Sequence, residues 1–414
     1  MADTVLRLAV VGGRRGRHFG RALGRLADRI RLTAVCDLAA EVLDAWQSEF
    51  PGARTYQRFD DLLADDAVDA VFLATPLPLH AGQAIAALGA GKHVLSEVTA
   101  NTTLDEGAAL IEAVRRTGLT YMLAENYCFM RPNLMVENLA AQGLFGEVTY
   151  LEGGYLHDCR QLMHTPTGEL TWRGQLRVDA NSVYYPTHSL GPVARWLRAA
   201  NGPGDRLVSV SAFTTRNAAV SDHFAERFGH DHPGADPGHW RQGDSGTAMI
   251  TTSSGALISL RVDASSPRPH NMTHYELQGL AGAYQSARYD GEDPLVWLAR
   301  DAAPARPGTE PERHWSSLWD YAAEYESDRW RDRMDVAAES GHGGGDSFVL
   351  EEFAAAISEG RQSAIDVHDA VLWSSVVPLS AESLRRGGAP VEFPDWLARP
   401  AARTGPGTAA PGSR

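Results

Sequence analysis

The chain contains 414 residues, of which 43% are hydrophobic and 22% charged, and its formal net charge is −14. This length predicts two or three domains, each able to bury its own core. The acidic charge argues against nucleic acid or an anionic membrane as a partner, and no apolar run approaches the roughly 18 residues of a membrane span. Three cysteines without metal-ligand spacing are typical of reduced thiols. We therefore expect a soluble, cytoplasmic protein.

The first hundred residues alternate between strand and helix signals. Leu6–Val11 is an apolar run typical of a buried strand, and it leads through Gly12–Gly16 into a helical pattern over His18–Ala27. A second apolar run, Leu32–Cys36, ends directly before Asp37. In dinucleotide-binding proteins this order places a pyrophosphate at a helix N-terminus and a ribose diol on a carboxylate. An acid at that point favours NAD over NADP, because a carboxylate repels a 2′-phosphate.

The glycine turn departs from the usual Gly-x-Gly-x-x-Gly pattern. Val11 occupies the place of the first glycine, whereas Gly13 and Gly16 keep their spacing. Glycine is needed there because a Cβ would hold the backbone away from the phosphates. A glycine turn alone is equally compatible with an ordinary loop, but the flanking strands and Asp37 favour a nucleotide site. We predict that the turn contacts the cofactor through Gly13, Arg14, Arg15 and Gly16.

The alternation continues to about residue 125 and predicts an α/β fold with a parallel, doubly wound sheet. Further strands are expected at Ala70–Ala74, His93–Ser96 and Thr120–Ala124, with helices at Ala39–Phe50, Phe59–Ala64, Ala81–Ala90 and Leu104–Thr117. Ligands of such sheets bind at the carboxyl ends of the strands. The residues expected to reach a cofactor from these ends are Asp37, Thr75, Leu77, His80, Glu97, Val98 and Asn126.

From about residue 127 the pattern changes. Period-two alternation predicts an open, mainly antiparallel sheet with strands at Glu147–Tyr155, Leu207–Thr214, Gly246–Thr252, Ala256–Asp263 and Thr273–Gln278. Helices are expected at Pro132–Gln142, Gly191–Ala199, Ser347–Ser358 and His368–Arg385. We therefore divide the chain into a dinucleotide-binding domain (residues 1–126), an α+β domain for substrate (127–399) and a disordered tail (400–414). Within the second domain, Ala302–Pro311 is expected to be a surface loop.

This arrangement resembles the Gfo/Idh/MocA family of NAD(P)-dependent sugar oxidoreductases. The segment Gly91–Glu97 is similar to the strand that precedes the family's Glu-Lys-Pro motif. Here Glu97-Val98-Thr99 stands in place of that motif, so the usual catalytic lysine is missing. Lys92, the only lysine of the chain, lies at the start of the strand and cannot reach the same place. The chain therefore departs from an ordinary sugar dehydrogenase of this family.

One subgroup of the family carries Glu-Val at this point: the NAD-dependent glycosidases of glycoside hydrolase family 109, typified by α-N-acetylgalactosaminidases. The resemblance extends from Val10 to about Ser374 and includes two specific motifs, Gly153-Gly154-Tyr155-Leu156-His157-Asp158 and Tyr185-Pro186-Thr187-His188. One departure is His270, which stands at about the place of a tyrosine and leaves the sugar open. Other similar segments are Glu125–Cys128, Gly143–Glu147, Trp172-Arg173, His232-Pro233, Gly341–Gly344 and Asp366–Asp369.

The resemblance implies a hydrolysis that begins with oxidation of the sugar at C3 by NAD. Elimination across C1 and C2, addition of water and re-reduction would follow. Such a route needs no pair of acids beside the glycosidic bond, and the chain offers only Asp158 and Glu152 as candidates for one. His188 is the expected base for the C3 hydroxyl, since a neutral imidazole titrates near the working pH. Tyr155 or Tyr185 would take the C2 proton.

Arg173 is expected to lower the pKa of a tyrosine, hold a cofactor phosphate or bind a sugar substituent. Trp172 is expected beside it at the cofactor, and Asn126 at the nicotinamide end. The structural alternatives are buried tyrosines, a helix-capping His188 and a turn-capping Asn126. The expected substrate contacts are Tyr155, Asp158, Arg173, Tyr185, His188 and His270.

Several histidines lie outside these motifs. Their spacing is irregular and no cysteine is nearby, so we predict no metal site. The glycine- and proline-rich segment that holds most of them is expected to form a loop over the substrate. His342, between glycines, is expected either in the active site or in a tight turn before the helix at Ser347. The five histidines considered for a metal are His223, His230, His232, His239 and His270.

Two other functions are compatible with the sequence: a net NAD-dependent sugar or cyclitol dehydrogenase that uses His188 in place of the lysine, and a non-catalytic nucleotide sensor. Glu97-Val98 with Tyr-Pro-Thr-His favours the glycosidase. The resemblance points to N-acetylgalactosaminides, but related enzymes act on sulfoquinovosides, whose anionic group would require Arg173, Arg160 or Arg241. The resemblance also implies a homo-oligomer formed through the face of the sheet.

Overall fold

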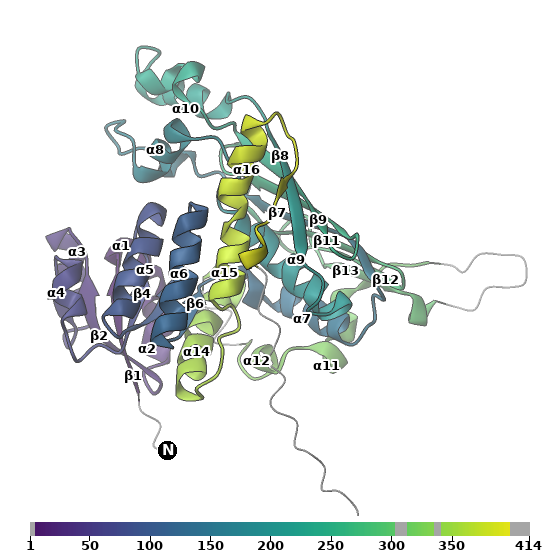
Figure 1. Cartoon of the computed structure of the whole chain (residues 1–414), viewed down its shortest axis with the longest axis horizontal. Helices are drawn as coiled ribbons and strands as arrows, with labels where there is room; N and C mark the ends of the chain where they lie inside the picture. Colours follow the sequence, from purple (N-terminus) through teal and green to yellow (C-terminus); the bar gives the residue numbers. More distant parts are fainter. Residues whose placement is uncertain (1–4, 303–312, 335–340, 398–414) are drawn as a thin grey trace, which may run out of the picture.

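The computed structural model describes residues 5–302, 313–334 and 341–397. Most of the expected surface loop at Ala302–Pro311 and the whole expected tail at 400–414 lie outside the described residues. Figure 1 shows two sheets side by side, one in the N-terminal third of the chain and a larger one in the remainder, with helices packed around and between them.

The N-terminal sheet is entirely parallel, with the strand order β3-β2-β1-β4-β5-β6. The predicted doubly wound fold is therefore confirmed. Its apolar strands are buried because helices cover both faces. The short edge strand β3 is the one that the sequence analysis missed. The strands are β1 (Leu6–Val11), β2 (Ile30–Cys36), β3 (Arg54–Tyr56), β4 (Ala70–Leu73), β5 (His93–Ser96) and β6 (Tyr121–Leu123).

The helices of this sheet follow their local signals. The clearest is α6 (Leu104–Thr117), which Thr103 and Glu106 cap reciprocally at its start and which ends at Gly118 in a left-handed conformation. The predicted helix at His18–Ala27 is wrong in its bounds: α1 (Gly13–Gly16), a 3₁₀ turn and α2 (Gly20–Arg25) replace it. Glycines inside this stretch weaken a continuous helix. The remaining helices are α3 (Ala40–Glu49), α4 (Phe59–Leu63) and α5 (His80–Gly89).

The second sheet has nine strands in the order β14-β13-β12-β11-β7-β10-β9-β8-β15. Only β7 and β10 pair in parallel, so the predicted open and mainly antiparallel sheet is confirmed. The five predicted strands are β7 (Val148–Leu156), β8 (Leu207–Thr214), β9 (Ser245–Thr252), β10 (Leu257–Asp263) and β11 (Asn271–Gly279). Shorter ones complete the sheet: β12 (Gly282–Gln285), β13 (Leu295–Leu298), β14 (Ser316–Ser317) and β15 (Val391–Glu392).

One face of this sheet is covered by α9 (Pro186–Asn201) on β7 and by α16 (Val376–Arg385) on β8. The approach of α9 requires Gly153, since a Cβ there would overlap the carbonyl of Ser189. The expected single helix at His368–Arg385 consists of α15 (Val367–Ser374) and α16, because Pro378 cannot donate the backbone hydrogen bond that would join them. Figure 1 shows α15 and α14 (Gly345–Ser358) beside the N-terminal helices, and α7 (Arg131–Ala141) packs on α9.

A small lobe extends from the second domain. It contains α8 (Trp172–Asp179) and α10 (Ala219–Phe228) around its own apolar cluster of Met163, Val220, Phe224 and Trp240. The expectation of a loop through His223–His239 is wrong for α10, and 3₁₀ turns occupy part of the remainder. The carboxylate of Asp244 accepts hydrogen bonds from the first backbone N–H groups of α10 and caps it from a distance. Figure 1 shows α8 standing above α1 and α6.

Candidate active site

The glycine turn forms a cradle against the carboxyl end of β4. Gly12 adopts a φ of +91°, and a Cβ there would lie 2.5 Å from the carbonyl oxygen of Ala74. A Cβ on Gly16 would overlap Val10, so this glycine permits close packing of helix on strand. The strained position is therefore Gly12, next to the Val11 that departs from the usual pattern. A turn that excludes side chains in this way fits the pyrophosphate of a dinucleotide.

Asp37 directly follows β2 and lies next to the glycine turn. Its carboxylate accepts hydrogen bonds from the backbone N–H of Gly13 at 2.8 Å and of Ala39 at 3.0 Å. These contacts fix the acid beside the start of α1, where a ribose diol would meet it. The residues present therefore fit NAD. Arg14, also predicted at the cofactor, is largely exposed and pairs with Glu41.

His80 connects the segments that follow the carboxyl ends of β4 and β5. Its ring nitrogens lie 2.9 Å from the carbonyl oxygen of Thr99 and 2.8 Å from that of Thr75, and burial lowers its pKa. The hydroxyl of Thr75 donates to Gln83, and Leu77 is buried. His80 thus braces the loop after β4 against the Glu97-Val98-Thr99 segment, of which Val98 is also buried.

Arg15 crosses from the glycine turn to the end of β5. Its Nε donates to Oε1 of Glu97 at 2.7 Å, and both side chains are largely buried. Burial opposes the charge on Arg15, but the acids around it, Glu97 first and then Asp346, together outweigh burial and raise the pKa of the guanidinium. Lys92 lies at the other end of β5, where its amine donates to the carbonyls of Asp65 and Val68. The only lysine is therefore remote from the site, as predicted.

His188 and Glu125 form the centre of the site. Nδ1 of His188 lies 2.7 Å from Oε1 of Glu125, whose side chain has no exposed surface and whose other oxygen has no hydrogen-bond partner in the part of the chain that the structure describes. His188 lies in the first turn of α9, which begins at Pro186. The Tyr127 ring stacks on His188 with the ring centroids 4.1 Å apart. Since Nδ1 donates to the carboxylate, the lone pair of a neutral ring lies on Nε2.

The two expected tyrosines lie beside His188. The Tyr155 ring centroid is 4.9 Å from that of His188 and 6.2 Å from that of Tyr185. The Tyr155 hydroxyl lies 2.8 Å from Nδ1 of His157. Burial raises the pKa of both phenols, and at Tyr185 the opposing charge of Arg173 does not outweigh it. Arg173 therefore does act to lower the pKa of Tyr185, as expected, but burial keeps the pKa of this phenol above its ordinary value.

The other predicted polar residues are less central. Asp158 accepts hydrogen bonds from the backbone and the guanidinium of Arg160, an arrangement that caps a turn. Arg173 stacks over Trp172 with its guanidinium carbon 4.2 Å from the ring centroid. Glu152 lies 3.4 Å from His274 on β11. Arg241 donates to the carbonyl of Asp179. Arg160, one of the three arginines considered for binding an anionic sugar, therefore already forms an ion pair with Asp158.

His270 stacks on His157 with the ring centroids 4.0 Å apart. Its Nδ1 lies 3.0 Å from the carbonyl oxygen of Leu156, and its Nε2 lies 3.3 Å from the Tyr127 hydroxyl. Burial and the neighbouring His270 lower the pKa of His157 to about 4. The structure therefore brings His270 into the group formed by His188, Tyr127 and Tyr155.

His342 also belongs to this group, although it comes from the far end of the chain. Its Nδ1 lies 3.1 Å from both carboxylate oxygens of Asp346, and Asn126 donates to the same acid at 2.7 Å. Its ring centroid is 6.1 Å from that of Tyr127. Glu125, Tyr127 and Asp346 were not predicted as site residues. Glu125 and Tyr127 carried a signal, because they directly follow β6, but Asp346 is brought to Asn126 only by tertiary folding.

The remaining histidines form no metal centre in the described ranges, where no group of three or more histidine, cysteine or acidic side chains could hold an ion. His223 instead lies 2.9 Å from His164, nitrogen to nitrogen. No helix within residues 5–302, 313–334 and 341–397 is long and apolar enough to cross a membrane.

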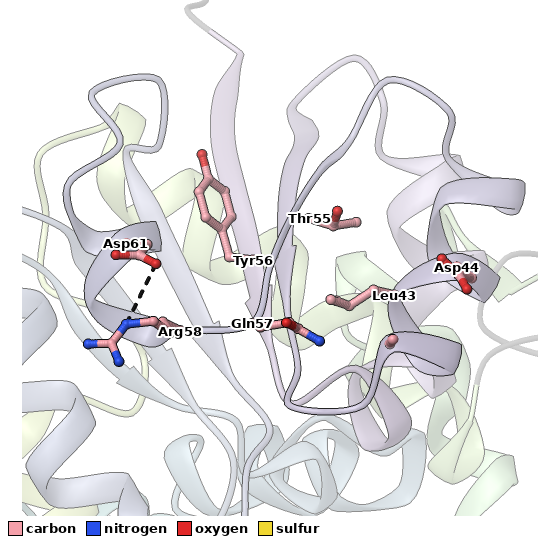
Figure 2. Close-up of a pocket in the computed structure, with 8 residues that line it drawn as sticks. Leu43, Asp44, Thr55, Tyr56, Gln57, Arg58 and Asp61 are labelled. Carbon is pink, nitrogen blue, oxygen red and sulfur yellow. Dashed lines mark ion pairs between the residues drawn. The ribbon is translucent and has the colours of Figure 1, made fainter.

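A surface hollow adjoins the N-terminal sheet at β3 (Figure 2). It is bordered by the ion pair of Arg58 with Asp61. None of the predicted site residues lines it, so it is separate from the acid–base group around His188. Its lining consists of Ala40, Leu43, Asp44, Thr55, Tyr56, Gln57, Arg58 and Asp61.

Comparison with known proteins agrees with this arrangement. Residues 6–125 match the model of the oxidoreductase family with an NAD-binding Rossmann fold, and residues 129–399 match the C-terminal domain of glycosyl hydrolase 109. A glycosyl hydrolase family 109 protein from Stenotrophomonas maltophilia is 32% identical, covering 95% of this chain and 89% of the relative. An alpha-N-acetylgalactosaminidase from Tannerella forsythia is 29% identical, covering 95% and 87%.

A solved structure of levoglucosan dehydrogenase in complex with NADH and levoglucosan has the same fold. It aligns with a TM-score of 0.72 at 20% identity, covering 94% of this chain and all of that one. The predicted family resemblance, fold class and cofactor are therefore confirmed. The chain belongs to glycosyl hydrolase family 109, and its N-terminal domain is the NAD-binding Rossmann domain of a Gfo/Idh/MocA-type enzyme.

Proposed function

We propose that this enzyme hydrolyses a glycoside by transient oxidation of the sugar at C3. The observation that carries the proposal is His188, whose Nδ1 is held by the buried carboxylate of Glu125 while the only lysine lies elsewhere. A histidine oriented in this way can take a hydroxyl proton and return it later. The substrate class we favour is an N-acetylhexosaminide, because the Tannerella forsythia relative is named an alpha-N-acetylgalactosaminidase.

The residues that would hold the cofactor are Gly12 and Gly13 at the pyrophosphate, with Gly16 allowing α1 to pack closely on β1, Asp37 at the adenosine ribose, and Asn126 near the nicotinamide. When bound, NAD supplies a reversible acceptor for the hydride of C3. Arg15 and Glu97 join the glycine turn to the end of β5 and would lie beside the bound cofactor.

In the oxidation, Nε2 of His188 takes the proton of the C3 hydroxyl. The resulting imidazolium is stabilised by Glu125, which accepts from Nδ1 in a region without exposed surface. Oxidation at C3 makes the hydrogen at C2 acidic, since a neighbouring ketone stabilises the enolate.

Tyr155 is the proposed acceptor of the C2 proton. Because burial raises its pKa, a free phenolate is unfavourable. Nδ1 of His157 lies within hydrogen-bond distance of the hydroxyl, so Tyr155 can pass its own proton there as it receives the new one. His157, whose pKa is about 4, does not keep this proton and releases it to water. The C2–H electron pair forms the C1–C2 double bond while the bond from C1 to the aglycone oxygen breaks. Water then adds across this bond and the ketone is reduced again.

An assay with p-nitrophenyl glycosides tests the proposal. The expected result is release of p-nitrophenol at constant absorbance of NADH, because the cofactor is regenerated in every turnover. Accumulation of NADH in step with product would favour the dehydrogenase function instead. The panel should include the α- and β-N-acetylgalactosaminides and a sulfoquinovoside, because sequence left the sugar open.

A further inference from the structure

The ring of Tyr127 lies flat against one face of His188. The two ring centroids are 4.1 Å apart and the ring planes are inclined by only 14°, and both residues are buried. The Tyr155 ring is inclined by 51° to the imidazole, and the Tyr185 ring centroid is 6.4 Å away. Among the described residues, Tyr127 therefore has the ring that lies closest to His188 and most nearly parallel to it.

The backbone of Tyr127 holds this ring in place. Tyr127 belongs to a 3₁₀ turn at Asn126–Phe129, and its N–H donates to Oε1 of Glu125 at 3.2 Å. The same oxygen accepts from Nδ1 of His188. The carbonyl of Tyr127 accepts a hydrogen bond from Asn133 at 2.7 Å. The backbone of Tyr127 thus anchors the acid while its side chain covers the histidine, so a change of the side chain leaves the backbone contact to the acid available.

The hydroxyl of Tyr127 interacts with a different residue, His270. Nδ1 of His270 donates to the carbonyl of Leu156 at 3.0 Å, so Nε2 of the neutral ring accepts from the Tyr127 hydroxyl, 3.3 Å away. Burial, and after it the charge of Glu125, raise the pKa of the Tyr127 phenol. Tyr127 is therefore a neutral phenol whose ring face keeps its partial negative charge.

The face of a neutral aromatic ring attracts a cation that lies within about 6 Å of its centroid, and the attraction is strongest where water is excluded. The imidazolium of His188 would lie in such a place, with Glu125 at Nδ1 in the plane of the ring and Tyr127 on its face. Glu125 is the acid among the titratable groups that face His188 or feel its charge. These groups are Glu125, Tyr127, Tyr155, His157, Tyr185, His270 and Tyr275.

We propose that Tyr127 is a positioning residue, which orients His188 and stabilises its protonated form through the face of the ring while Glu125 does so at Nδ1. This inference rests on the function proposed above, in which His188 takes the proton of the C3 hydroxyl. Tyr127 exchanges no proton in this role. The proton stays on Nε2 of His188 until the C3 ketone is reduced again, and the stacked ring lowers the free energy of the enzyme during that interval.

Two substitutions separate the ring from its hydroxyl. Tyr127→Phe keeps the stacked ring, so kcat on a p-nitrophenyl glycoside should stay within about twofold of the wild type, whereas Tyr127→Leu should lower it by roughly 5–30-fold, the range of a buried cation–π contact. Tyr127→Leu should also move the acidic limb of the pH profile of kcat/KM to lower pH by roughly 0.5–1.5 pH units. The direction follows because the imidazolium loses stabilisation and the neutral ring does not.

A series of fluorinated phenylalanines at position 127 tests the same role if Tyr127→Leu does not fold. Fluorine withdraws electron density from the face of the ring and changes its size little, so log(kcat/KM) should decrease with each fluorine added. Tyr284→Leu is the matched control, since Tyr284 is also fully buried but packs on Trp196. It should lower the melting temperature without moving the acidic limb of the pH profile.

Three results would overturn the inference: an unmoved acidic limb in Tyr127→Leu, a fluorine series without a trend, or a loss in Tyr127→Phe as large as that in Tyr127→Leu. The last result would assign the effect to the hydroxyl and its contact with His270. The function proposed above fails separately, if the wild-type enzyme exchanges no hydrogen at C2 of the sugar during turnover.

Discussion

Nδ1 of His188 lies 2.7 Å from Oε1 of Glu125, and the second oxygen of this fully buried carboxylate has no hydrogen-bond partner among the described residues. A buried carboxylate in this position selects the tautomer of the ring and stabilises its charged form. The pair joins Glu125, which lies just after β6, to His188, in the first turn of α9. The two residues are 63 positions apart in the sequence.

Replacing Glu125 with glutamine should therefore impair catalysis more than folding. We expect kcat on a p-nitrophenyl glycoside to fall by roughly 10²–10⁴, because the neutral amide no longer stabilises the imidazolium. Steady-state kinetics with the NAD content of each preparation measured in parallel provides the check. Glu152→Gln is the matched control, since Glu152 faces His274 instead of the site. Near-normal kcat in Glu125→Gln would refute the role of the acid.

Substitution of His188 by alanine should abolish turnover while cofactor binding and the melting temperature are retained. The expected loss is at least roughly a hundredfold, the scale of a missing general base. Turnover and cofactor fluorescence should be measured on the same sample. A variant that keeps most of its activity would make His188 structural and require another base at C3.

Asp37 should determine the choice of cofactor. Its carboxylate stands beside the glycine turn, so Asp37→Ala should weaken NAD binding by roughly 1–3 kcal/mol, the range of a charged hydrogen bond. Calorimetric titration of protein freed of cofactor measures this effect, and Asp28→Ala, an exposed acid before the opposite end of β2, is the control. Wild-type protein that binds NAD and NADP equally well would contradict this assignment.

The free energy of unfolding should decrease as the pH is lowered from 6.5 to 4, the range in which His157 is protonated in the unfolded chain but neutral in the folded one. The pKa of this ring is about 4 in the folded chain, against an ordinary value of 6.5, because of burial and the adjacent His270. The unfolded chain thus binds more protons between these pH values, and the free energy of unfolding decreases as the pH falls from 6.5 to 4. Calorimetry should show a shallower decrease of Tm in His157→Gln, with the other buried histidines supplying the remainder. An unchanged slope would mean that His157 is protonated in the native state.

The sequence predicted the N-terminal sheet well, because its strands are continuous apolar runs flanked by glycine turns and amphipathic helices. The five long strands of the second sheet were equally clear from alternation. By contrast, β12–β15 are too short to show a period, and α10 depends on Asp244, which caps the helix from beyond its end. Such elements are stabilised by partners that local patterns do not contain.

The residues of the candidate site likewise fall into those that sequence motifs predicted and those that only the structure revealed. Motifs predicted His188, Tyr155 and Tyr185, and the structure brings these rings together. The acids that hold the histidines were not predicted: Glu125 carried a signal through its position after β6, whereas Asp346 acquires its role only through contacts made by folding. His342 lies both in a turn directly before α14 and beside the Tyr127 ring, so the structure is compatible with both alternatives left open for it, an active-site position and a tight turn.

The most direct test of the central claim is turnover of an aryl glycoside in deuterated water, with the released sugar analysed by mass spectrometry and proton NMR. Elimination removes the hydrogen at C2 and water returns one, whereas direct displacement at C1 leaves that hydrogen in place. We predict one deuterium at C2 of the released sugar and no net formation of NADH. A released sugar that keeps its hydrogen at C2 would contradict the account.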